Sequence, residues 1–150
     1  MVTRVWSRFI VVLFCFVLLC RWSAGVHVVE LAVESNDGAY LFVGVIGEGW
    51  TDFATAFNQG GGWSLQADGY VYDNGSGTDM GSGAKLESGS RVTMVVDMDG
   101  KTVEFRVNGV SIKTCELKSD RVCPAVCFGG SGQLVGIQET SGEVAGAAGI

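Results

Sequence analysis

The chain has 150 residues, 47% of them hydrophobic and 17% charged, which suits one domain with its own hydrophobic core. Its formal net charge is −6; the first 25 residues hold three of the 10 basic residues and none of the 16 acidic ones, so the remainder carries 7 basic residues and a charge of −9. Nucleic acid is therefore excluded as an expected partner, because neutralising phosphates needs a basic surface.

Residues 1–25 have the layout of a secretory signal peptide. Arg4 and Arg8 precede a run of 12 apolar residues at 9–20, and the small residues Ser23 and Gly25 follow. Cleavage is expected after Gly25. Two alternatives stay open: an uncleaved membrane anchor, although the run is shorter than the ~20 residues of a membrane span, and an extension that a truncated or misjoined gene model added. A signal peptide or an uncleaved anchor predicts a secreted or membrane-associated protein, and a gene-model extension predicts an intracellular one.

The chain after residue 25 is predicted to consist of short antiparallel strands. It has one proline and no long stretch with helical spacing, and Gly, Asn and Asp separate its alternating segments. Residues 27–34 alternate apolar and polar side chains. Residues 39–47 are almost continuously apolar, as in a strand buried on both faces. The turn sequence at 35–38 predicts that these two strands form a hairpin.

Residues 48–87 are rich in glycine and less regular in pattern. Two short strands are predicted at 63–66 and 70–73, and the composition of 74–83 predicts a loop. Trp63 is expected in the core, because large aromatic residues dominate protein cores. Trp50 stands where a strand leads into a loop and fits either the core or a binding surface.

Residues 91–98, 101–107 and 110–114 are predicted to form a three-strand meander. Asp99-Gly100 and Asn108-Gly109 stand at its two junctions, and such pairs between alternating segments are the strongest short hairpin signals in a sequence. The side chains expected to face the core are Val92, Met94, Val96, Met98, Val103, Phe105, Val107, Val110 and Ile112.

Two more strands are predicted at 122–130 and 133–139. The small residues of 140–150 predict a flexible tail. We therefore divide the chain into a leader at 1–25, a domain at 26–139 and the tail. Nine or ten strands after residue 25 predict an all-β, antiparallel two-sheet sandwich.

Three cysteines lie outside the leader: Cys115, Cys123 and Cys127. Their number is odd and their spacing is not that of a metal site. On an extended strand Cys123 and Cys127 would be about 13 Å apart, beyond the reach of a direct disulfide. We favour three buried, reduced thiols; a bond from Cys115 to one of the other two remains the alternative.

The segment around Gly100 contains fragments of two ligand-binding motifs. Asp97 and Asp99 precede Gly100 as in a calcium loop, and Gly100-Lys101-Thr102 is the end of a phosphate loop. The phosphate motif needs a glycine at position 95, where this chain has valine, and both motifs need a flanking helix where strands are predicted. Neither site is expected, and we predict no metal and no cofactor.

Catalysis is not expected either. The single histidine, His27, lies on a predicted strand without an activated nucleophile beside it. The glycine-rich residues 129–133 lack the last glycine of a nucleophile elbow. Glu48 and Asp52 lie beside Trp50 and leave a glycoside hydrolase as a minor alternative. Asn74-Gly75-Ser76 is a glycosylation sequon, which matters only if the chain is exported.

Four segments together resemble the SPRY domain family in order and spacing. They are YLFVGVIGEGW (40–50), GGGWSLQADGYVYDNG (60–75), GSRVTMVVDMDGKTVEFRVNG (89–109) and CPAVCFGGSGQLVGI (123–137). The resemblance covers about residues 26–138, and its most specific part is the hairpin with Asn108-Gly109. Domains of this family usually carry further strands before the position of Val26, where this chain has its apolar leader.

The resemblance implies a concanavalin A-like β-sandwich that binds a protein or peptide partner without catalysis. Family partners dock on loops at one rim, so the loops to consider are 48–58, 74–82, 118–121 and 129–132. Within and beside them we expect partner-binding residues at Trp50, Asp52, Phe53, Tyr72 and Asp79. A secreted lectin-like module, with Trp50 stacked on a sugar, is the alternative. The family is mostly intracellular, which supports the intracellular alternative, and a membrane would be met only through an uncleaved leader.

Overall fold

The computed structural model describes residues 4–10, 15–17, 21–36, 40–50, 58–128 and 134–140. These residues form twelve strands and one short 3-10 helix, η1 (Ser82–Ala84). The strands are β1 (Arg4–Ile10), β2 (Cys15–Val17), β3 (Val26–Ser35), β4 (Leu41–Gly47), β5 (Gly62–Gln66), β6 (Tyr70–Asp73), β7 (Ser76–Asp79), β8 (Arg91–Asp97), β9 (Thr102–Val107), β10 (Val110–Glu116), β11 (Val122–Phe128) and β12 (Leu134–Thr140).

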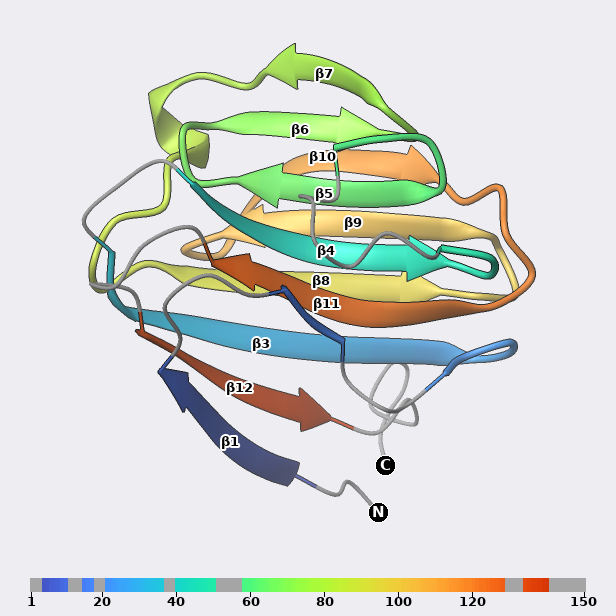
Figure 1. Ribbon diagram of the computed structural model, residues 1–150, viewed down its shortest axis with the longest axis horizontal. Helices are drawn as coiled ribbons and strands as arrows, with labels where there is room; N and C mark the ends of the chain where they lie inside the picture. The colour runs from blue at the N-terminus through green and yellow to red at the C-terminus, as the bar shows by residue number, and fades with distance from the viewer. Residues whose placement is uncertain are drawn as a thin grey trace.

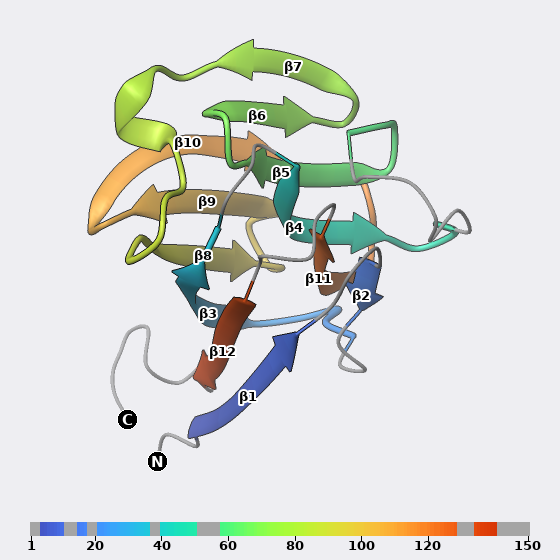
Figure 2. The ribbon, with the colours of Figure 1, turned by 60° about the vertical axis from the view of Figure 1, so that its left-hand side comes forward.

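The strands form two antiparallel sheets that stack as two layers (Figures 1 and 2). The first sheet has the order β1-β12-β3-β8-β9-β10, and the second has the order β2-β11-β4-β5-β6-β7. The predicted all-β, two-sheet sandwich is therefore confirmed, with ten strands after residue 25.

The main core lies between the sheets and follows the predicted alternation. On β3 the residues Val29, Leu31 and Val33 are buried while their neighbours are not. Trp63 is 1% exposed and belongs to this core, as expected. Strand β4 is buried on both faces, also as expected. Its Leu41, Val43 and Val45 face the main core; Phe42 and Ile46 join a second, smaller cluster on the outer face, with Ala125 and Cys127 of β11.

The predicted hairpin between residues 27–34 and 39–47 is wrong. β3 pairs with β8 and β12 in the first sheet, and β4 pairs with β5 and β11 in the second. The chain therefore crosses from one layer to the other between them. A strand buried on both faces finds more apolar contact inside a sheet than at the edge of a two-strand ribbon, which explains the crossing.

The meander of β8, β9 and β10 is confirmed. Asn108 and Gly109 both have positive φ, 51° and 84°, as a two-residue turn of the mirror-image type requires. The first turn is longer than a two-residue turn: Met98 to Lys101 connect the strands, and Lys101 has the positive φ of 57°. Val110 is 63% exposed, so its predicted inward position is wrong, whereas Ile112 packs against the core.

Residues 74–83, predicted to be a loop, contain a strand. Asn74 and Gly75, with φ of 52° and 93°, fold the chain back, and β7 pairs with β6. All four residues of β7 are exposed. The prediction failed because β7 has no apolar residue: its backbone pairs at the edge of the sheet without contributing a side chain to the core.

The predicted leader contributes to both sheets. β1 pairs with β12, and β2 pairs with β11. Trp22 belongs to the core at 7% exposure, exchanges backbone hydrogen bonds with Val122 (2.9 and 3.1 Å) and stacks on His27 at a centroid distance of 4.5 Å. Gly25 accepts a hydrogen bond from the backbone N–H of Met98. Among the described residues, no helix has the length and apolar character needed to cross a membrane.

The three cysteines of the domain differ in state. Cys115 and Cys123 are free thiols. Cys127 is disulfide-bonded, so the prediction of three reduced cysteines is wrong for this residue. In the backbone register of β11 and β2, position 127 lies opposite position 15. The pairing of β2 with β11 could not be predicted from the sequence, in which Cys15 falls within the predicted leader.

A candidate binding site at one rim of the sandwich

Segments far apart in the sequence meet at one rim, the right-hand end of the sandwich in Figure 1. β4, β6, β8 and β10 end there, and β3, β5, β9 and β11 begin there. Backbone hydrogen bonds join the connections: Gly47 to Gly61 (2.7 Å), Glu48 to Arg121 (3.1 Å) and Leu117 to Lys101 (2.8 Å). The rim is therefore one continuous surface.

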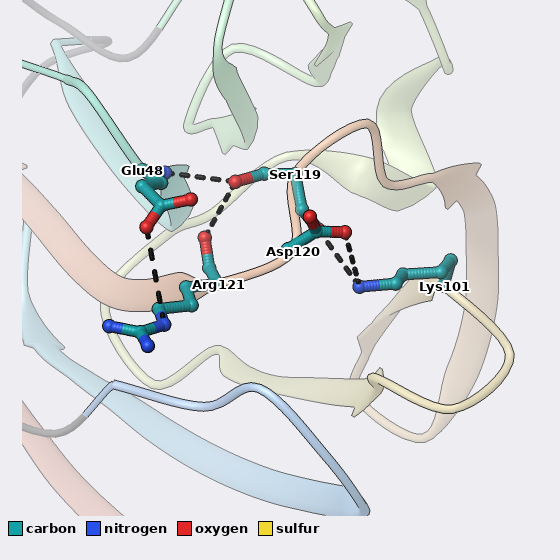
Figure 3. Close-up of polar contacts among 5 residues, drawn as sticks. All are labelled: Glu48, Lys101, Ser119, Asp120 and Arg121. Carbon is teal, nitrogen blue, oxygen red and sulfur yellow. Dashed lines mark hydrogen bonds and ion pairs between the residues drawn. The ribbon is translucent and has the colours of Figure 1, made fainter.

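The side chain of Ser119 links the segment after β4 to the segment between β10 and β11 (Figure 3). The backbone N–H of Glu48 donates to Ser119 Oγ at 2.9 Å, and Ser119 Oγ donates to the carbonyl of Arg121 at 2.7 Å. A Cβ at Gly47 would lie 2.9 Å from the Cβ of Ser119. The close approach of the Ser119 side chain to the backbone at position 47 therefore depends on glycine there.

Two pairs of opposite charges lie on the rim surface. Arg121 Nε is 4.0 Å from Glu48 Oε2, and Lys101 Nζ is 3.4 Å from Asp120 Oδ1 (Figure 3). Lys101 also donates to the carbonyl of Ser119 at 3.3 Å. Exposed pairs such as these contribute at most about 1 kcal/mol each to stability. Their charges can therefore be exchanged for those of a partner at little cost.

A cavity of about 90 Å³ opens beside these groups. Trp50, which is half-buried, forms one wall and packs against the outer-face cluster of the second sheet. Burial raises the pKa of the Cys123 thiol in another wall, and the Arg21 guanidinium, which hydrogen-bonds to it, partly offsets this effect. The lining is made of Arg21, Ile46, Gly47, Glu48, Gly49, Trp50, Arg121 and Cys123.

The five predicted partner-binding residues are only partly brought together. Trp50 lies at the rim. Tyr72 packs against the same outer-face cluster as Trp50, but on β6, in the outer surface of the second sheet. Asp79, on the edge strand β7, accepts a hydrogen bond from the N–H of Gly81 at 2.9 Å. Asp52 and Phe53 lie outside the described residues.

The predicted loops also divide between the two ends of the sandwich. Residues 48–50, 74–75 and 118–121 reach the rim, while 80–82 lie at the opposite end, where Met80 donates to the carbonyl of Gly69. Residues 129–133 lie outside the described residues. Arg21 and Cys123, which line the rim cavity, were not predicted as site residues. One feature of the sequence could have pointed to Arg21 as a site residue: it precedes the first predicted strand of the domain, where SPRY domains usually carry further strands.

The residues considered for chemistry have structural partners. His27 Nε2 lies 2.8 Å from the carbonyl of Ala24, and its ring stacks on Trp22, as expected for a satisfied imidazole. Asp97 Oδ1 accepts from the N–H of Gly100 at 2.8 Å, which holds the turn. Within the described ranges, no three His, Cys, Asp or Glu side chains are grouped to hold a metal ion. Asn74 is exposed, and its Oδ1 accepts from the N–H of Gly61 at 2.7 Å.

Comparison with known proteins relates the chain to solved structures. No protein-family model and no curated protein sequence matches it. The SPRY domain of human HERC1 matches with a TM-score of 0.69 and 22% identity, over 82% of this chain and 80% of that one. Another human SPRY domain has a TM-score of 0.67, 19% identity and coverage of 82% of each chain. The PSpry domain of TRIM65 has a TM-score of 0.65 and 16% identity, over 83% of this chain and 70% of that one.

These three matches cover most of this chain and most of each matched chain. They agree with the resemblance carried by the hairpin of β8 and β9 and by the strands around it. The chain has the fold of a SPRY domain.

Proposed function

We propose that the chain is a non-catalytic protein-binding module that recognises a protein or peptide segment through the rim. The observation that carries this proposal is the rim itself, where Trp50 and the exposed pair of Glu48 and Arg121 line a small cavity and a second exposed ion pair lies on the same rim. Domains with this fold typically serve as protein-interaction modules, which supports the same conclusion.

The chemistry of the rim suits a peptide better than a small molecule. Small-molecule sites usually enclose about 300 Å³ or more, and the rim cavity has about 90 Å³. Half-buried tryptophan and arginine side chains are the residues that most often dominate the energy of protein interfaces. Trp50 would therefore anchor the partner, and Glu48 and Arg121 would set its charge preference.

Selection from a random peptide library displayed on phage tests the proposal. Peptides enriched on the wild-type chain should bind Trp50→Ala at least about 30-fold more weakly, as for an interface anchor worth 2 kcal/mol. Glu48→Gln should weaken the subset of basic peptides. Val110→Ala, at an exposed position of the opposite end, is the matched control and should bind as the wild type does. Equal binding by the wild type and Trp50→Ala would overturn the rim as the site.

The exposed part of Trp50 also suits the lectin-like alternative, since aromatic faces stack on sugars. A glycan array decides between the two. Binding to sugars, lost after periodate oxidation of the target, would favour the lectin. Peptide binding that survives periodate would remove it. The hydrolase alternative depends on Glu48 and Asp52, of which the structure describes only Glu48. If Glu48→Ala left a measured glycosidase activity unchanged, Glu48 would not be the catalytic carboxylate.

We further propose that the chain enters the secretory pathway. The disulfide of Cys127 supports this location, because disulfides persist mainly in oxidising compartments. Because Trp22 packs in the core, we expect the mature chain to retain it and any signal-peptide cleavage to occur before residue 22. Intact mass after expression in a eukaryotic host tests both points, together with glycosylation at Asn74. An unprocessed, unglycosylated cytosolic product would favour the intracellular alternative.

A further inference from the structure

Four aromatic rings form a continuous row on the outer face of the second sheet. Tyr40 meets Phe42 edge-on at 5.2 Å between ring centroids, Phe42 lies 6.0 Å from Tyr72, and Tyr72 stacks on Tyr70 at 6.1 Å. We call Tyr40, Phe42, Tyr72 and Tyr70 the aromatic row. It contains all three tyrosines of the chain.

Strand alternation places the row on the outer face. Val43 and Val71 point into the main core, so Phe42, Tyr70 and Tyr72 point away from it. The neighbouring strand leaves room for them: a Cβ at Gly77, opposite Tyr72 on β7, would lie 2.7 Å from the tyrosine ring. The row is therefore a built feature of β4, β6 and β7, and it lies outside the rim cavity.

The row is partly open to solvent. Tyr40 is 46% exposed and Tyr70 is 36% exposed. They are two of the three exposed large hydrophobic side chains in the described part of the chain, and the third, Val110, lies alone at the turn between β9 and β10. Phe42, which joins Tyr40 to Tyr72, is 1% exposed and Tyr72 is half-buried, so solvent reaches the row mainly at Tyr40 and Tyr70.

Carboxylates flank the row. Asp68 Oδ1 accepts from the N–H of Tyr70 at 3.1 Å, and Asp79 lies opposite Tyr70 in the pairing of β6 and β7. The pKa of Tyr72 is raised by burial, and the negative charge of Asp68 raises it further. Negative charge therefore lies close to Tyr70 and Tyr72.

The sequence around the row carries no cation of its own. From Trp22 to Ala84 there is no lysine or arginine, and the acidic residues are Glu30, Glu34, Asp37, Glu48, Asp52, Asp68, Asp73 and Asp79. Lys85 follows and lies beside Gly69, where it shares a hollow with Asp68. The strands β4, β5, β6 and β7 therefore supply aromatic rings and carboxylates but no lysine or arginine of their own, and Lys85 is a basic residue beside Asp68.

We propose that the aromatic row is a docking surface for a basic, arginine-containing segment of a protein partner. A guanidinium stacks on tyrosine faces by cation–π attraction, and its N–H groups can reach the carboxylates of Asp68 and Asp79. The proposal rests on the protein-binding function proposed above, but it concerns a different surface from the rim. Lysine would bind less well, because its compact ammonium is more strongly hydrated and does not stack.

Titration of the full chain, labelled with ¹³C in its tyrosine rings, tests the proposal. The probe is the capped peptide Gly-Arg-Gly-Arg-Gly, and its controls carry lysine or the neutral isostere citrulline in place of arginine. The arginine peptide should shift all three tyrosine signals in a saturable manner. The lysine peptide should bind more weakly, and the citrulline peptide should produce no saturable shift. Equal binding of the arginine and citrulline peptides would overturn the proposal, and so would unmoved tyrosine signals.

Three variants locate the surface. Tyr70→Ala should weaken binding of the arginine peptide about fivefold, as expected for one exposed cation–π contact. Tyr70→Phe keeps the ring and should bind within about twofold of the wild type. Asp68→Asn keeps the shape of the side chain, and so tests the charge even if Tyr70→Ala fails to fold. Unchanged affinity in Asp68→Asn and in folded Tyr70→Ala would contradict the proposal.

The failure of this proposal is distinguishable from failure of the proposed function. If Trp50→Ala no longer binds the selected peptides and the arginine peptide does not shift the tyrosine signals of the wild type, the module binds through its rim alone. If the arginine peptide binds while no rim-dependent peptide is found, the aromatic row is the binding surface and the rim is not.

Discussion

Cys115 and Cys123 stand on consecutive strands, but their thiols have different surroundings. Cys115 is 1% exposed, and burial, together with the nearby carboxylate of Asp73, raises its pKa to about 12. Cys123 is half-buried in the wall of the rim cavity, next to the Arg21 guanidinium. Since the thiolate is the reactive form, accessibility and charge both favour reaction at Cys123.

We therefore expect iodoacetamide at pH 8 to alkylate Cys123 in the folded protein and to leave Cys115 unmodified. Mass spectrometry of peptides sampled over time measures the two rates. In guanidinium chloride both thiols should react at similar rates, which provides the control. Alkylation of Cys115 as fast as Cys123 under native conditions would contradict the burial of Cys115.

Glu104 provides a pH-dependent contact on the outer face of β9. Arg106 donates to its carboxylate at 2.8 Å, and this hydrogen bond lowers the pKa of Glu104, with a further contribution from Ser111. A carboxylate whose pKa is lower in the folded state stabilises the fold above its unfolded pKa. That stabilisation disappears as the pH falls through the folded pKa.

At pH 7 we expect Glu104→Gln to lose less than about 1 kcal/mol of unfolding free energy, because the pair is partly exposed. The difference between the variant and the wild type should shrink as the pH falls below about 4, where the unfolded carboxyl becomes protonated. Urea unfolding at several pH values measures it. If the difference in unfolding free energy between the wild type and Glu104→Gln grew as the pH fell, the ionised form of Glu104 would not be the stabilising one.

At the scale of elements, alternation of side chains predicted which face of a strand is buried, but not which strand lies beside it. The burial of β3 and β4 was predicted correctly, and their pairing was not. The reason is physical: alternation records contact with the opposite sheet, whereas pairing joins backbones that all residues share. The β8–β9–β10 meander was predictable because the Asn108-Gly109 turn specifies the pairing of β9 with β10 locally, and Asp99-Gly100 marks the longer turn between β8 and β9.

The segment before β3 is the element whose role the sequence resolved least. Trp22 packs in the core and bridges to Val122, although it falls within the stretch predicted to be cleaved. We expect Trp22→Ala to reduce the unfolding free energy by about 3–5 kcal/mol, as for a large buried aromatic residue. The exposed neighbour Ser23 is the control, and Ser23→Ala should change stability by less than about 0.5 kcal/mol. Urea unfolding of the full chain measures both, and equal stabilities of the two variants would contradict a core role for Trp22.

At the scale of the whole molecule, the rim depends on contacts that no local pattern records. Ser119 and Glu48 are 71 residues apart in the sequence and share a hydrogen bond. The resemblance to a known family named three of the connections that meet there, and composition marked them as loops. Neither indicated that Arg21 and Cys123 complete the cavity, because both positions depend on how β11 packs beside the N-terminal segment.

At Trp63, in the main core, we expect the loss of side-chain volume to reduce stability more than the loss of the indole N–H. This residue is 1% exposed, and its Nε1 has no hydrogen-bond partner among the described residues. Trp63→Phe loses apolar contact but also removes a buried, unpaired donor, which itself costs about 1–3 kcal/mol. We expect Trp63→Phe to destabilise the protein by less than about 2 kcal/mol and Trp63→Ala by about 3–5 kcal/mol. Urea unfolding with an unchanged m-value checks this, and equal losses would show that volume does not dominate.

The polar composition of β7 has a consequence for how the protein behaves at high concentration. Among the strands that the structure describes, β7 is the outermost of the second sheet, and none of them pairs with its outer row of backbone groups. Open edges of this kind promote edge-to-edge aggregation unless they are short, polar or charged. Ser76, Gly77, Thr78 and Asp79 make this edge four residues long, fully exposed and free of apolar side chains. The lack of apolar side chains in β7 made the strand unpredictable from the sequence pattern. The same lack disfavours self-association along that edge.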